Sequence, residues 1–282
     1  MDIPFVGSDA IAAGWLTPSQ LRHRYRALYR GVYVPNGHAV SLRDRIIGAS
    51  LACPSAVITG IAASAMHGAK WVGPDVTVEI VAPVRRQAGL TVRRERLHDD
   101  EITEIAGIRV ATPARAAFDL ARHLPRDQAV PRLDALMNAR PFSTEDVALL
   151  AKRYRGARGL QRLRTALPLV DGGAESPRET WLRLLFVDAG LPYPTTQYVV
   201  LDESGRYVRR LDMVWEEFRV GAEYDGEQHL TSRGQYVLDV QVSRVLQRLG
   251  WHVIHVIKED WPTEVVAEAR TALLARGWRP RK

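Results

Sequence analysis

The chain has 282 residues, a formal net charge of +7 and a single cysteine. This length exceeds one typical domain, so we expect two globular units, or one unit with a large N-terminal addition. The lone Cys53 excludes an internal disulfide and a thiolate-cluster metal site, and it is typical of a small buried residue in a reducing compartment. The sequence shows neither an apolar run of membrane-spanning length nor an export signal at its start, so we expect a cytoplasmic protein with no membrane partner.

Charge is divided unequally along the chain. Residues 1–170 carry 24 Lys and Arg against 15 Asp and Glu, a net +9, whereas residues 171–282 carry 15 against 17, a net −2. A basic half suits a polyphosphate partner, because each cationic side chain placed against a phosphate releases condensed counterions. The alternative is a solvated surface in a chain that favours arginine over lysine, 35 against four. Charge alone does not separate these two interpretations.

Residues 1–40 have the pattern of a small winged-helix unit. A short helix at 9–13 is followed by a second that begins at 17–20 with a capping box and a proline in its first turn. The aromatic and β-branched residues at 29–35 favour a wing strand. Together they would present four arginines to duplex DNA, namely Arg22, Arg24, Arg26 and Arg30. An ordinary solvated helix is the alternative explanation.

Residues 41–170 have the periodicities of a mixed α/β region. Helices are expected at 42–52, 113–120, 130–137 and 143–151, and short strands at 76–81, 90–94 and 108–111. His67 and His98 have no partner at metal-ligand spacing, so both are interpreted as structural. Adjacent glycines within 171–175 break any helix, and we place a domain boundary there, which makes 171–282 the last domain.

The last domain has its predicted elements in the order αβββαβ. A helix opens at residue 176, a hairpin and a third strand follow, and a helix and a final strand close the unit; the strands are expected at 197–201, 207–215, 219–225 and 251–257. Because strand–helix–strand crossovers are right-handed, the last strand should run parallel to the third. The predicted fold class is therefore α/β, or α+β overall, with a winged-helix and mixed α/β region ahead of this core.

Carboxylates concentrate on two neighbouring strands of the predicted core. Glu223 and Asp225 are two residues apart and would share one face at roughly 6.6 Å. Asp212 interrupts an apolar run on the adjacent strand, where an unpaired carboxylate is costly. A divalent cation would remove the repulsion among the three acids. Oxygen-only ligands favour Mg²⁺ or Mn²⁺, so Asp212, Glu223 and Asp225 are the predicted metal ligands.

These residues carry a resemblance to a nuclease family. The run Arg-Leu-Asp-Met at 210–213 and the run Ala-Glu-Tyr-Asp-Gly-Glu-Gln-His at 222–229 are similar to the very-short-patch-repair-endonuclease-like branch of the PD-(D/E)XK superfamily. The opening Ser-Pro-x-Glu helix and the closing Leu-Gly-Trp-x-Val strand fit it too, so the resemblance covers roughly 176–260. It implies a restriction-endonuclease-like core in which metal-bound acids activate water against a DNA phosphodiester.

The resemblance also implies roles for individual residues. Glu179 corresponds to the acid on the helix, Asp212 to the central metal ligand and Glu223 to the first acid of the third motif. The superfamily's lysine is replaced here by Asp225, which would add a metal ligand. Gln228 or His229 would then have to assist with the phosphate or with a proton.

Each acid also has an explanation without catalysis. Glu179 is the third residue after a helix cap, where a capping box accounts for it, and Asp225 precedes a glycine, where a turn accounts for it. Arginines at 209 and 210 could neutralise Asp212 and Glu223. These structural alternatives stay open on the sequence alone.

A second resemblance lies upstream of the boundary. The Tyr-Arg-Gly-Val-Tyr wing at 29–33, the segment Ser-Ala-Met-His-Gly at 64–68 and the segment Gly-Ile-Arg-Val-Ala-Thr-Pro at 107–113 resemble the AbiEi-type antitoxin winged-helix family. In that family a winged-helix module and a nuclease-type module are commonly fused, which is the arrangement predicted here.

Two hypotheses of different classes follow. The first is a Mg²⁺-dependent deoxyribonuclease, an endonuclease recruited to duplex DNA by the basic winged-helix region, in phage defence, restriction or repair. The alternative is a non-catalytic, antitoxin-like transcriptional regulator with a degenerate nuclease domain, which the missing lysine favours and the retained acids disfavour. An RNA-processing enzyme is a third class. Expected partners are DNA and a toxin or defence-system protein, and a homodimer is a further option.

Overall fold

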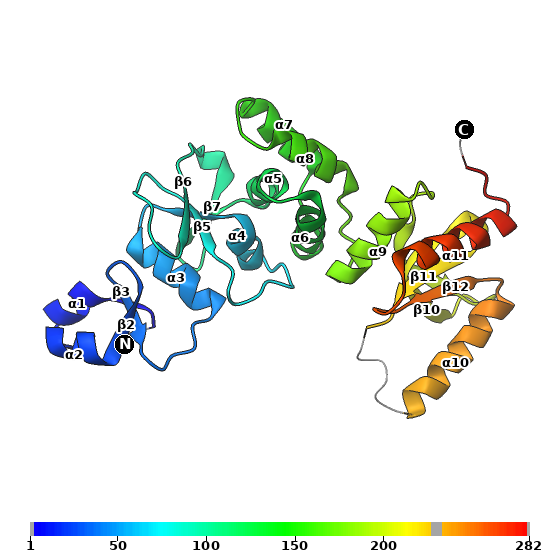
Figure 1. Ribbon diagram of the computed structural model, residues 1–282, viewed down its shortest axis with the longest axis horizontal. Coiled ribbons are helices and arrows are strands. Elements are labelled where there is room, and N and C mark those ends of the chain that lie inside the picture. Colours follow the sequence, from blue (N-terminus) through cyan, green and yellow to red (C-terminus); the bar gives the residue numbers. More distant parts are fainter. Residues whose placement is uncertain (1–2, 227–232, 281–282) are drawn as a thin grey trace. The chain divides into compact units, whose positions relative to one another are not determined.

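The computed structural model describes residues 3–226 and 233–280, except for the side chains of Gln235 and Tyr236. The chain divides into two compact units, Met1–Val170 and Asp171–Lys282, called unit 1 and unit 2 below. Their helices and strands form a mixed α+β protein, which confirms the predicted fold class (Figure 1). Among the described helices, none combines the length and apolar character needed to cross a bilayer.

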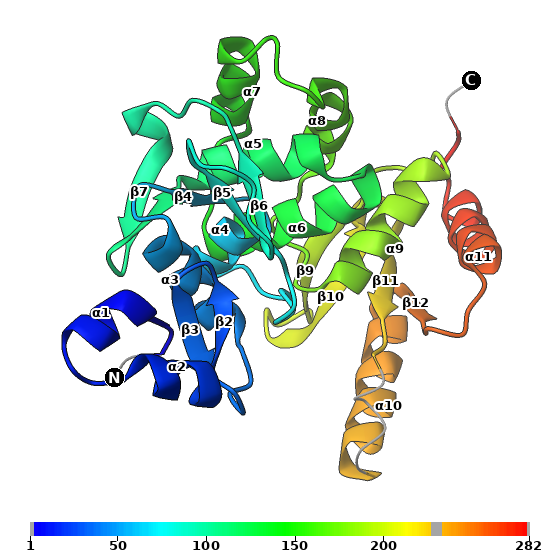
Figure 2. The same cartoon turned by 60° about the vertical axis from the view of Figure 1, so that its left-hand side comes forward.

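Unit 1 begins with two short helices beside a β-hairpin (Figure 2). The elements are β1 (Phe5–Val6), α1 (Gly7–Ala12), α2 (Pro18–Arg24), β2 (Tyr25–Tyr29) and β3 (Val32–Pro35), and the strands form a sheet of order β1-β3-β2. The predicted capping box is present, because Thr17 and Gln20 each accept a hydrogen bond from the other's backbone N–H. Leu21 anchors α2 in a small core with Phe5 and Ala10.

The rest of unit 1 packs helices against a five-stranded sheet of order β6-β5-β4-β8-β7. Its strands are β4 (Val57–Thr59), β5 (Val78–Val81), β6 (Leu90–Arg93), β7 (Ile102–Ile105) and β8 (Ile108–Ala111). Its helices are α3 (Leu42–Ala52), α4 (Gly60–Met66), α5 (Pro113–His123), α6 (Arg126–Ala139), α7 (Thr144–Arg153) and α8 (Leu160–Ala166), with single 3-10 turns at Asp99–Glu101 and Leu167–Leu169. The sequence-based strand at 76–81 starts two residues too early, and β4, α4, β7 and α8 were not predicted.

A buried ion network crosses the core of unit 1. Arg115 is 1% exposed, and it donates to Asp119, to Glu101 at 2.6 Å and to Glu95 at 2.9 Å. Arg122 donates to the same Asp119 at 2.8 Å and also contacts Glu95. Each buried acid therefore faces at least one arginine, which compensates its loss of water.

Unit 2 has the predicted order αβββαβ, followed by one further helix. The elements are α9 (Pro177–Asp188), β9 (Thr195–Leu201), β10 (Tyr207–Trp215), β11 (Val220–Tyr224), α10 (Arg233–Arg248), β12 (His252–Val256) and α11 (Pro262–Ala275), with a 3-10 turn at Glu216–Phe218. The sheet has the order β12-β11-β10-β9, and β12 runs parallel to β11 as predicted.

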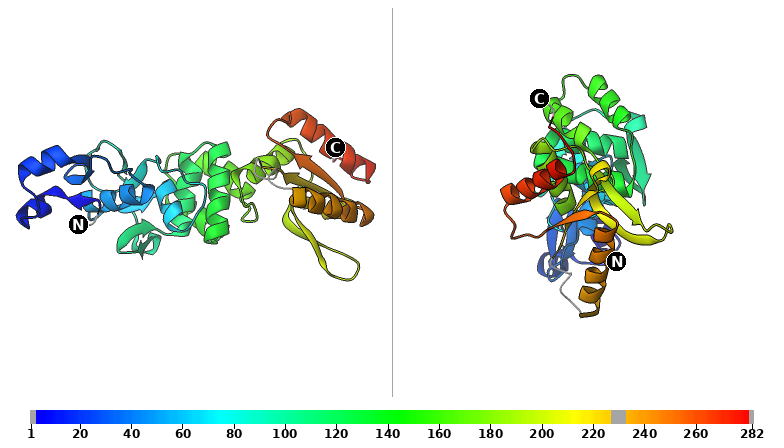
Figure 3. Two further views of the ribbon diagram at one scale, coloured as in Figure 1. Left: turned by 90° about the horizontal axis from the view of Figure 1, so that it is seen from below. Right: turned by 90° about the vertical axis from the view of Figure 1, so that its right-hand side faces the viewer.

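Two apolar clusters hold the helices of unit 2 to the sheet. One joins α9 and α11 to the strands through residues such as Phe186, Met213 and Leu273, and the other joins α10 through Leu211 and Leu246. Helices α10 and α11 accordingly lie on opposite faces of the sheet (Figure 3). This layering fixes the positions of β10, β11 and β12, whose side chains carry the predicted acids.

The ion network gives a stability prediction for unit 1. Arg115→Met keeps most of the side-chain volume but leaves Glu101 and Asp119 without their shared arginine, so we expect a loss of about 3–5 kcal/mol in unfolding free energy. Urea titrations followed by hydrogen exchange over 113–123 measure it. The exposed Arg158→Ala is the control and should change the free energy by less than about 0.5 kcal/mol. A comparably small loss for Arg115→Met would contradict this account of the network.

Candidate functional site

Two adjacent strands bring the predicted acids of unit 2 together. Met213 of β10 pairs with Ala222 of β11, so the preceding Asp212 lies across from Glu223. The carboxylate of Asp212 accepts a hydrogen bond of 2.8 Å from the backbone N–H of Tyr224, which fixes it at the end of β11. Asp225 follows directly after β11, one residue beyond the strand, and its N–H bonds the carbonyl of Val256.

Asp212 is buried and lies within the electrostatic influence of the other three acids. Burial is the largest cause that raises its pKa to about 7, the N–H of Tyr224 opposes the rise, and the negative charges of Glu179, Glu223 and Asp225 contribute to it. No ion pair reaches Asp212 within residues 3–226 and 233–280. The predicted acids therefore come from α9, β10 and the end of β11 and influence one another's charge.

Glu179 belongs to the first turn of α9 and is also one of the four acids whose charges influence Asp212. Ser176 caps α9 by accepting a hydrogen bond from the N–H of Glu179. The carboxylate of Glu179 accepts from the N–H of Glu175 and from the side-chain amide of Gln197, at 2.8 and 3.0 Å. Burial raises the pKa of Glu179, so the local bonds do not remove the cost of its charge.

The two neighbouring arginines neutralise the group only in part. Arg209 donates to Oε1 of Glu223 at 2.8 Å and to Asp239 of α10 at 3.1 Å. Arg210 instead pairs with Glu175. The charge of Arg209 is thus shared between Glu223 and Asp239, and Arg210 pairs with an acid outside the group.

His255 belongs to the site, and the sequence analysis missed it. It pairs in register with Glu223 across the parallel strands β11 and β12, and its Nδ1 lies 3.0 Å from Oδ2 of Asp225 and 3.8 Å from Oε2 of Glu223. The hydrogen bond with Asp225 raises the pKa of His255, against the effect of burial. The predicted parallel pairing of the last strand with the third was the signal that could have located this residue.

Gln228 and His229 fall outside the described residues. Their proposed assistance to catalysis stays a prediction.

The four predicted DNA-binding arginines are all exposed. Arg22 and Arg24 lie in the last turn of α2, Arg26 lies on β2 and Arg30 lies in the turn between β2 and β3. Arg26 donates to the carbonyl of His38 at 3.0 Å. No ion pair among the described part of the chain involves these arginines, and residues 3–40 contain a single acid, Asp9. The end of α2 and the hairpin therefore form a surface with uncompensated positive charge, here called the arginine surface.

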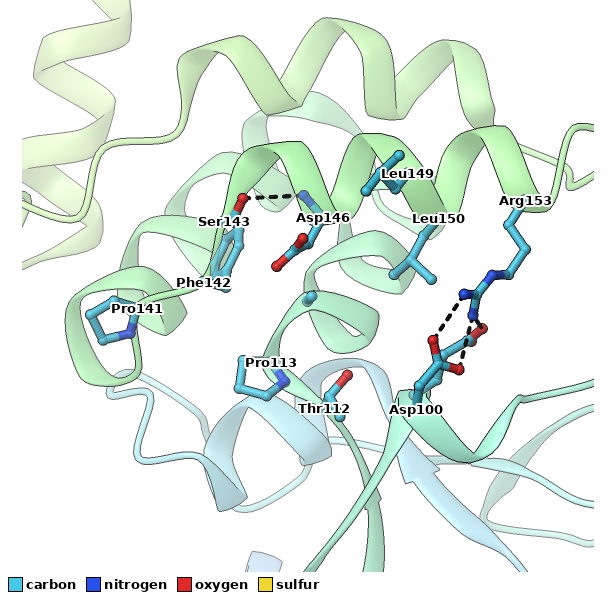
Figure 4. A pocket seen from close by; sticks show the side chains of 12 residues that line it. Asp100, Thr112, Pro113, Pro141, Phe142, Ser143, Asp146, Leu149, Leu150 and Arg153 are labelled. Carbon is cyan, nitrogen blue, oxygen red and sulfur yellow. Dashed lines mark hydrogen bonds and ion pairs between the residues drawn. The ribbon is translucent and has the colours of Figure 1, made fainter.

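A separate pocket of about 680 Å³ lies in unit 1 between α7 and the start of α5 (Figure 4). Three of its four charged groups pair with one another, since Arg153 contacts Asp100 at 2.8 Å and Glu101 at 2.7 Å. Ser143 is engaged in capping α7.

Comparison with known proteins finds similarity over part of the chain. Residues 33–169 match the family of the AbiEi antitoxin C-terminal domain. Two uncharacterized proteins of Mycobacterium tuberculosis, from two strains, are each 31% identical to this chain over 159 residues, covering 56% of this chain and 58% of each relative. No solved structure matches the chain.

These comparisons confirm the predicted antitoxin resemblance for residues 33–169. They give no support to the nuclease resemblance of 176–260, which stays a prediction. Residues 1–32, which include most of the arginine surface, lie ahead of the matched range.

The raised pKa of Asp212 predicts a pH-dependent stability in metal-free protein. Its folded pKa of about 7 exceeds the ordinary value of 3.8, so its contribution to stability is fully present below pH 3.8 and is lost as the pH rises through 7. Asp212→Asn keeps an acceptor for the N–H of Tyr224 and removes the charge. We expect the variant to unfold about 5 °C or more above the parent at pH 8.5, and by a clearly smaller margin at pH 5, where only part of the cost of the charge is present.

Thermal unfolding of the full chain in EDTA at these two pH values tests this expectation. The conservative Asp188→Asn, at the far end of α9, serves as the control because that residue is not among the four acids. An Asp212→Asn chain that is no more stable than the parent at pH 8.5 would show that the carboxylates are not crowded.

Proposed function

We propose that this chain is an antitoxin-type, DNA-binding regulator. The observation that carries the proposal is the arginine surface, with its exposed and uncompensated charge, directly ahead of a region that matches an antitoxin C-terminal domain. Four arginines on a helix end and an adjoining hairpin are suited to phosphates and base edges of a duplex. The net +9 of residues 1–170 supports the same partner.

The helix and hairpin are rigid enough to present these arginines in a fixed arrangement. Leu21 holds one side of α2 against Phe5, and the capping box fixes the start of the helix. Arg22 and Arg24 are both exposed to solvent. A toxin protein is a further proposed partner, on the strength of the antitoxin match alone.

Removal of the arginine surface tests the DNA-binding function. In the triple variant Arg22→Ala, Arg24→Ala, Arg30→Ala we expect weaker binding to duplex DNA and a salt dependence whose log–log slope is smaller by about 3, because about one counterion is released per phosphate contact. Fluorescence anisotropy across a salt series measures both quantities. Arg158→Ala removes an exposed arginine of unit 1 away from this surface and should leave the slope unchanged. Equal slopes for the triple variant and the parent would rule out this interface.

A second candidate function is hydrolysis of DNA by a Mg²⁺- or Mn²⁺-dependent endonuclease. The specific observation in its favour is the convergence of Glu179, Asp212, Glu223 and Asp225, and the buried Oε2 of Glu223, which accepts no hydrogen bond from a described group. These features fit a cation site. Asp212, Glu223 and Asp225 would hold the ion, which when bound would supply charge neutralisation and a water of lowered pKa.

In this second function, residues of the chain would orient the metal ligands and the attacking water. The N–H of Tyr224 orients Asp212, and Arg209 orients Glu223 through Oε1 while leaving Oε2 available. Glu179 lies in the first turn of α9, where its carboxylate accepts hydrogen bonds from the N–H of Glu175 and the side-chain amide of Gln197. There it would orient a water. The lysine usual in the resembling family has no counterpart at Asp225, so turnover is the property that needs testing.

Incubation with supercoiled plasmid separates the two functions. If the second function holds, the parent nicks DNA in Mg²⁺ or Mn²⁺ and loses at least about a hundredfold in rate on Asp212→Ala, as expected when a central ligand is removed. EDTA should abolish the reaction in the parent. If neither plain, mismatched nor branched DNA is cut by the parent, the hydrolytic function is excluded and the regulator alone stands.

A further inference from the structure

The clearest unexplained feature of unit 2 is a buried carboxylate oxygen that has no hydrogen-bond donor among the described groups and only the imidazole of His255 at 3.8 Å. Glu223 is 4% exposed. Its Oε1 accepts from Arg209, whereas its Oε2 accepts no hydrogen bond from any described group. A buried acceptor without a donor costs about 1–3 kcal/mol, and more when it is charged. An additional positive centre beside Oε2 would remove that cost.

Two further ligand atoms stand beside this oxygen. Glu223, Asp225 and His255 each offer one atom, and the three atoms lie within 4.8 Å of one another. The geometry follows from the backbone. Glu223 and His255 are paired in register on the parallel strands β11 and β12, and Asp225 lies two residues beyond Glu223, on the same side of the chain.

The surrounding charge remains strongly negative. Arg209 lies nearby, but its charge is divided between Glu223 and Asp239. Asp212 on β10 feels the negative charges of Glu223 and Asp225 and has no ion pair among the described residues. A cation would therefore be attracted rather than repelled, even with Arg209 in place.

The donor set has a chemical preference that the carboxylates alone lack. Mg²⁺ is held by oxygen ligands and retains several waters, and imidazole is a poor partner for it. Imidazole suits the divalent first-row transition metals, for which carboxylates are also good ligands. A site with one imidazole and two or three carboxylates should therefore discriminate against Mg²⁺.

We propose that His255 is a metal ligand, and that Glu223, Asp225 and His255 bind a divalent transition-metal ion in preference to Mg²⁺. This inference deepens the second proposed function, since it rests on the same carboxylates forming a cation site, and it replaces the oxygen-only ligand set expected from the sequence. It does not depend on whether that site cleaves DNA.

Binding of Mn²⁺ and Mg²⁺ to the tag-free full chain tests the proposal. Mn²⁺ binding is followed by the loss of the free-ion electron paramagnetic resonance signal, and Mg²⁺ binding by competition with Mn²⁺. We expect one Mn²⁺ per chain, bound at least about tenfold more tightly than Mg²⁺. His255→Ala should weaken Mn²⁺ binding by about tenfold or more and change Mg²⁺ binding little.

His252 supplies a matched control on the same strand. It is exposed, it pairs in register with Val220, and it is not part of the ligand group. His252→Ala should therefore leave the binding of both ions unchanged. The pulsed resonance spectrum of bound Mn²⁺ provides a direct readout, because coupling to an imidazole nitrogen should be present in the parent and in His252→Ala and absent in His255→Gln.

The outcomes separate this inference from the function on which it rests. If Mn²⁺ binds without nitrogen coupling, and His255→Ala binds it as tightly as the parent, His255 is not a ligand and the inference is overturned, while an all-oxygen site for the hydrolytic function survives. If the parent binds neither ion, both the inference and the hydrolytic function fall. The His255–Asp225 contact would then be an ion pair without a metal.

Discussion

Crowding of carboxylates is the constraint on which the C-terminal unit depends. Asp212 lies beside Glu179, Glu223 and Asp225, and its one hydrogen bond to the backbone of Tyr224 offsets only part of the cost of its charge. Buried acids that serve only stability are usually matched by cations, or are replaced by apolar residues at little cost. The group around Asp212 is matched only in part, by Arg209 at Glu223 and by His255 at Asp225, and the excess of negative charge is what the proposed cation site rests on.

Unit 1 shows how the same chain treats buried acids that have a structural role. Asp119 is as inaccessible as any residue of the core, and it is contacted by both Arg115 and Arg122. Burial raises the pKa of Asp119, but the two arginines outweigh it and hold the pKa below its usual value. In unit 2 the balance is reversed, since the pKa of Asp212 is raised to about 7. The lowered pKa of Asp119 is typical of a structural ion network, whereas the raised pKa of Asp212 is typical of a candidate site.

The charges of the two units would suit different tasks in the proposed functions. Residues 1–170 carry +9 and include the arginine surface, so they can supply the affinity for a polyanion. Residues 171–282 carry −2 and concentrate carboxylates at one point, so they would repel a phosphate in the absence of a cation. A regulator needs only the first property. A metal-dependent hydrolase needs both, with the ion bridging the acids and the phosphate.

Much of this arrangement could be predicted from the sequence where periodicity is strong. The alternation in residues 207–225 predicted β10 and β11 to within a residue or two, and the right-handed crossover rule predicted that β12 is parallel to β11. Two of the missed elements lack a polar face. The alanine-rich α4 is largely buried and shows no 3.6-residue pattern, and β4 has only three residues, all of them buried.

Side-chain partners were predictable only where they are local. The capping box at Thr17 involves residues three apart, so the sequence contains it in full. His255 lies 30 residues after Asp225, and only the pairing of two strands brings the two together. The choice between Arg209 and Arg210 as the partner of Glu223 likewise depends on which face of β10 each side chain occupies.

Anomalous diffraction from crystals of the full chain soaked in Mn²⁺ is the most direct test of the central claim, that the acids of unit 2 surround a cation. The account predicts one strong peak within about 2.5 Å of carboxylate oxygens of Asp212 or Glu223, with Asp225 beside it. An absent peak, together with an arginine side chain occupying the space next to Oε2 of Glu223, would contradict it. Unit 2 would then hold its acids for a reason other than metal binding.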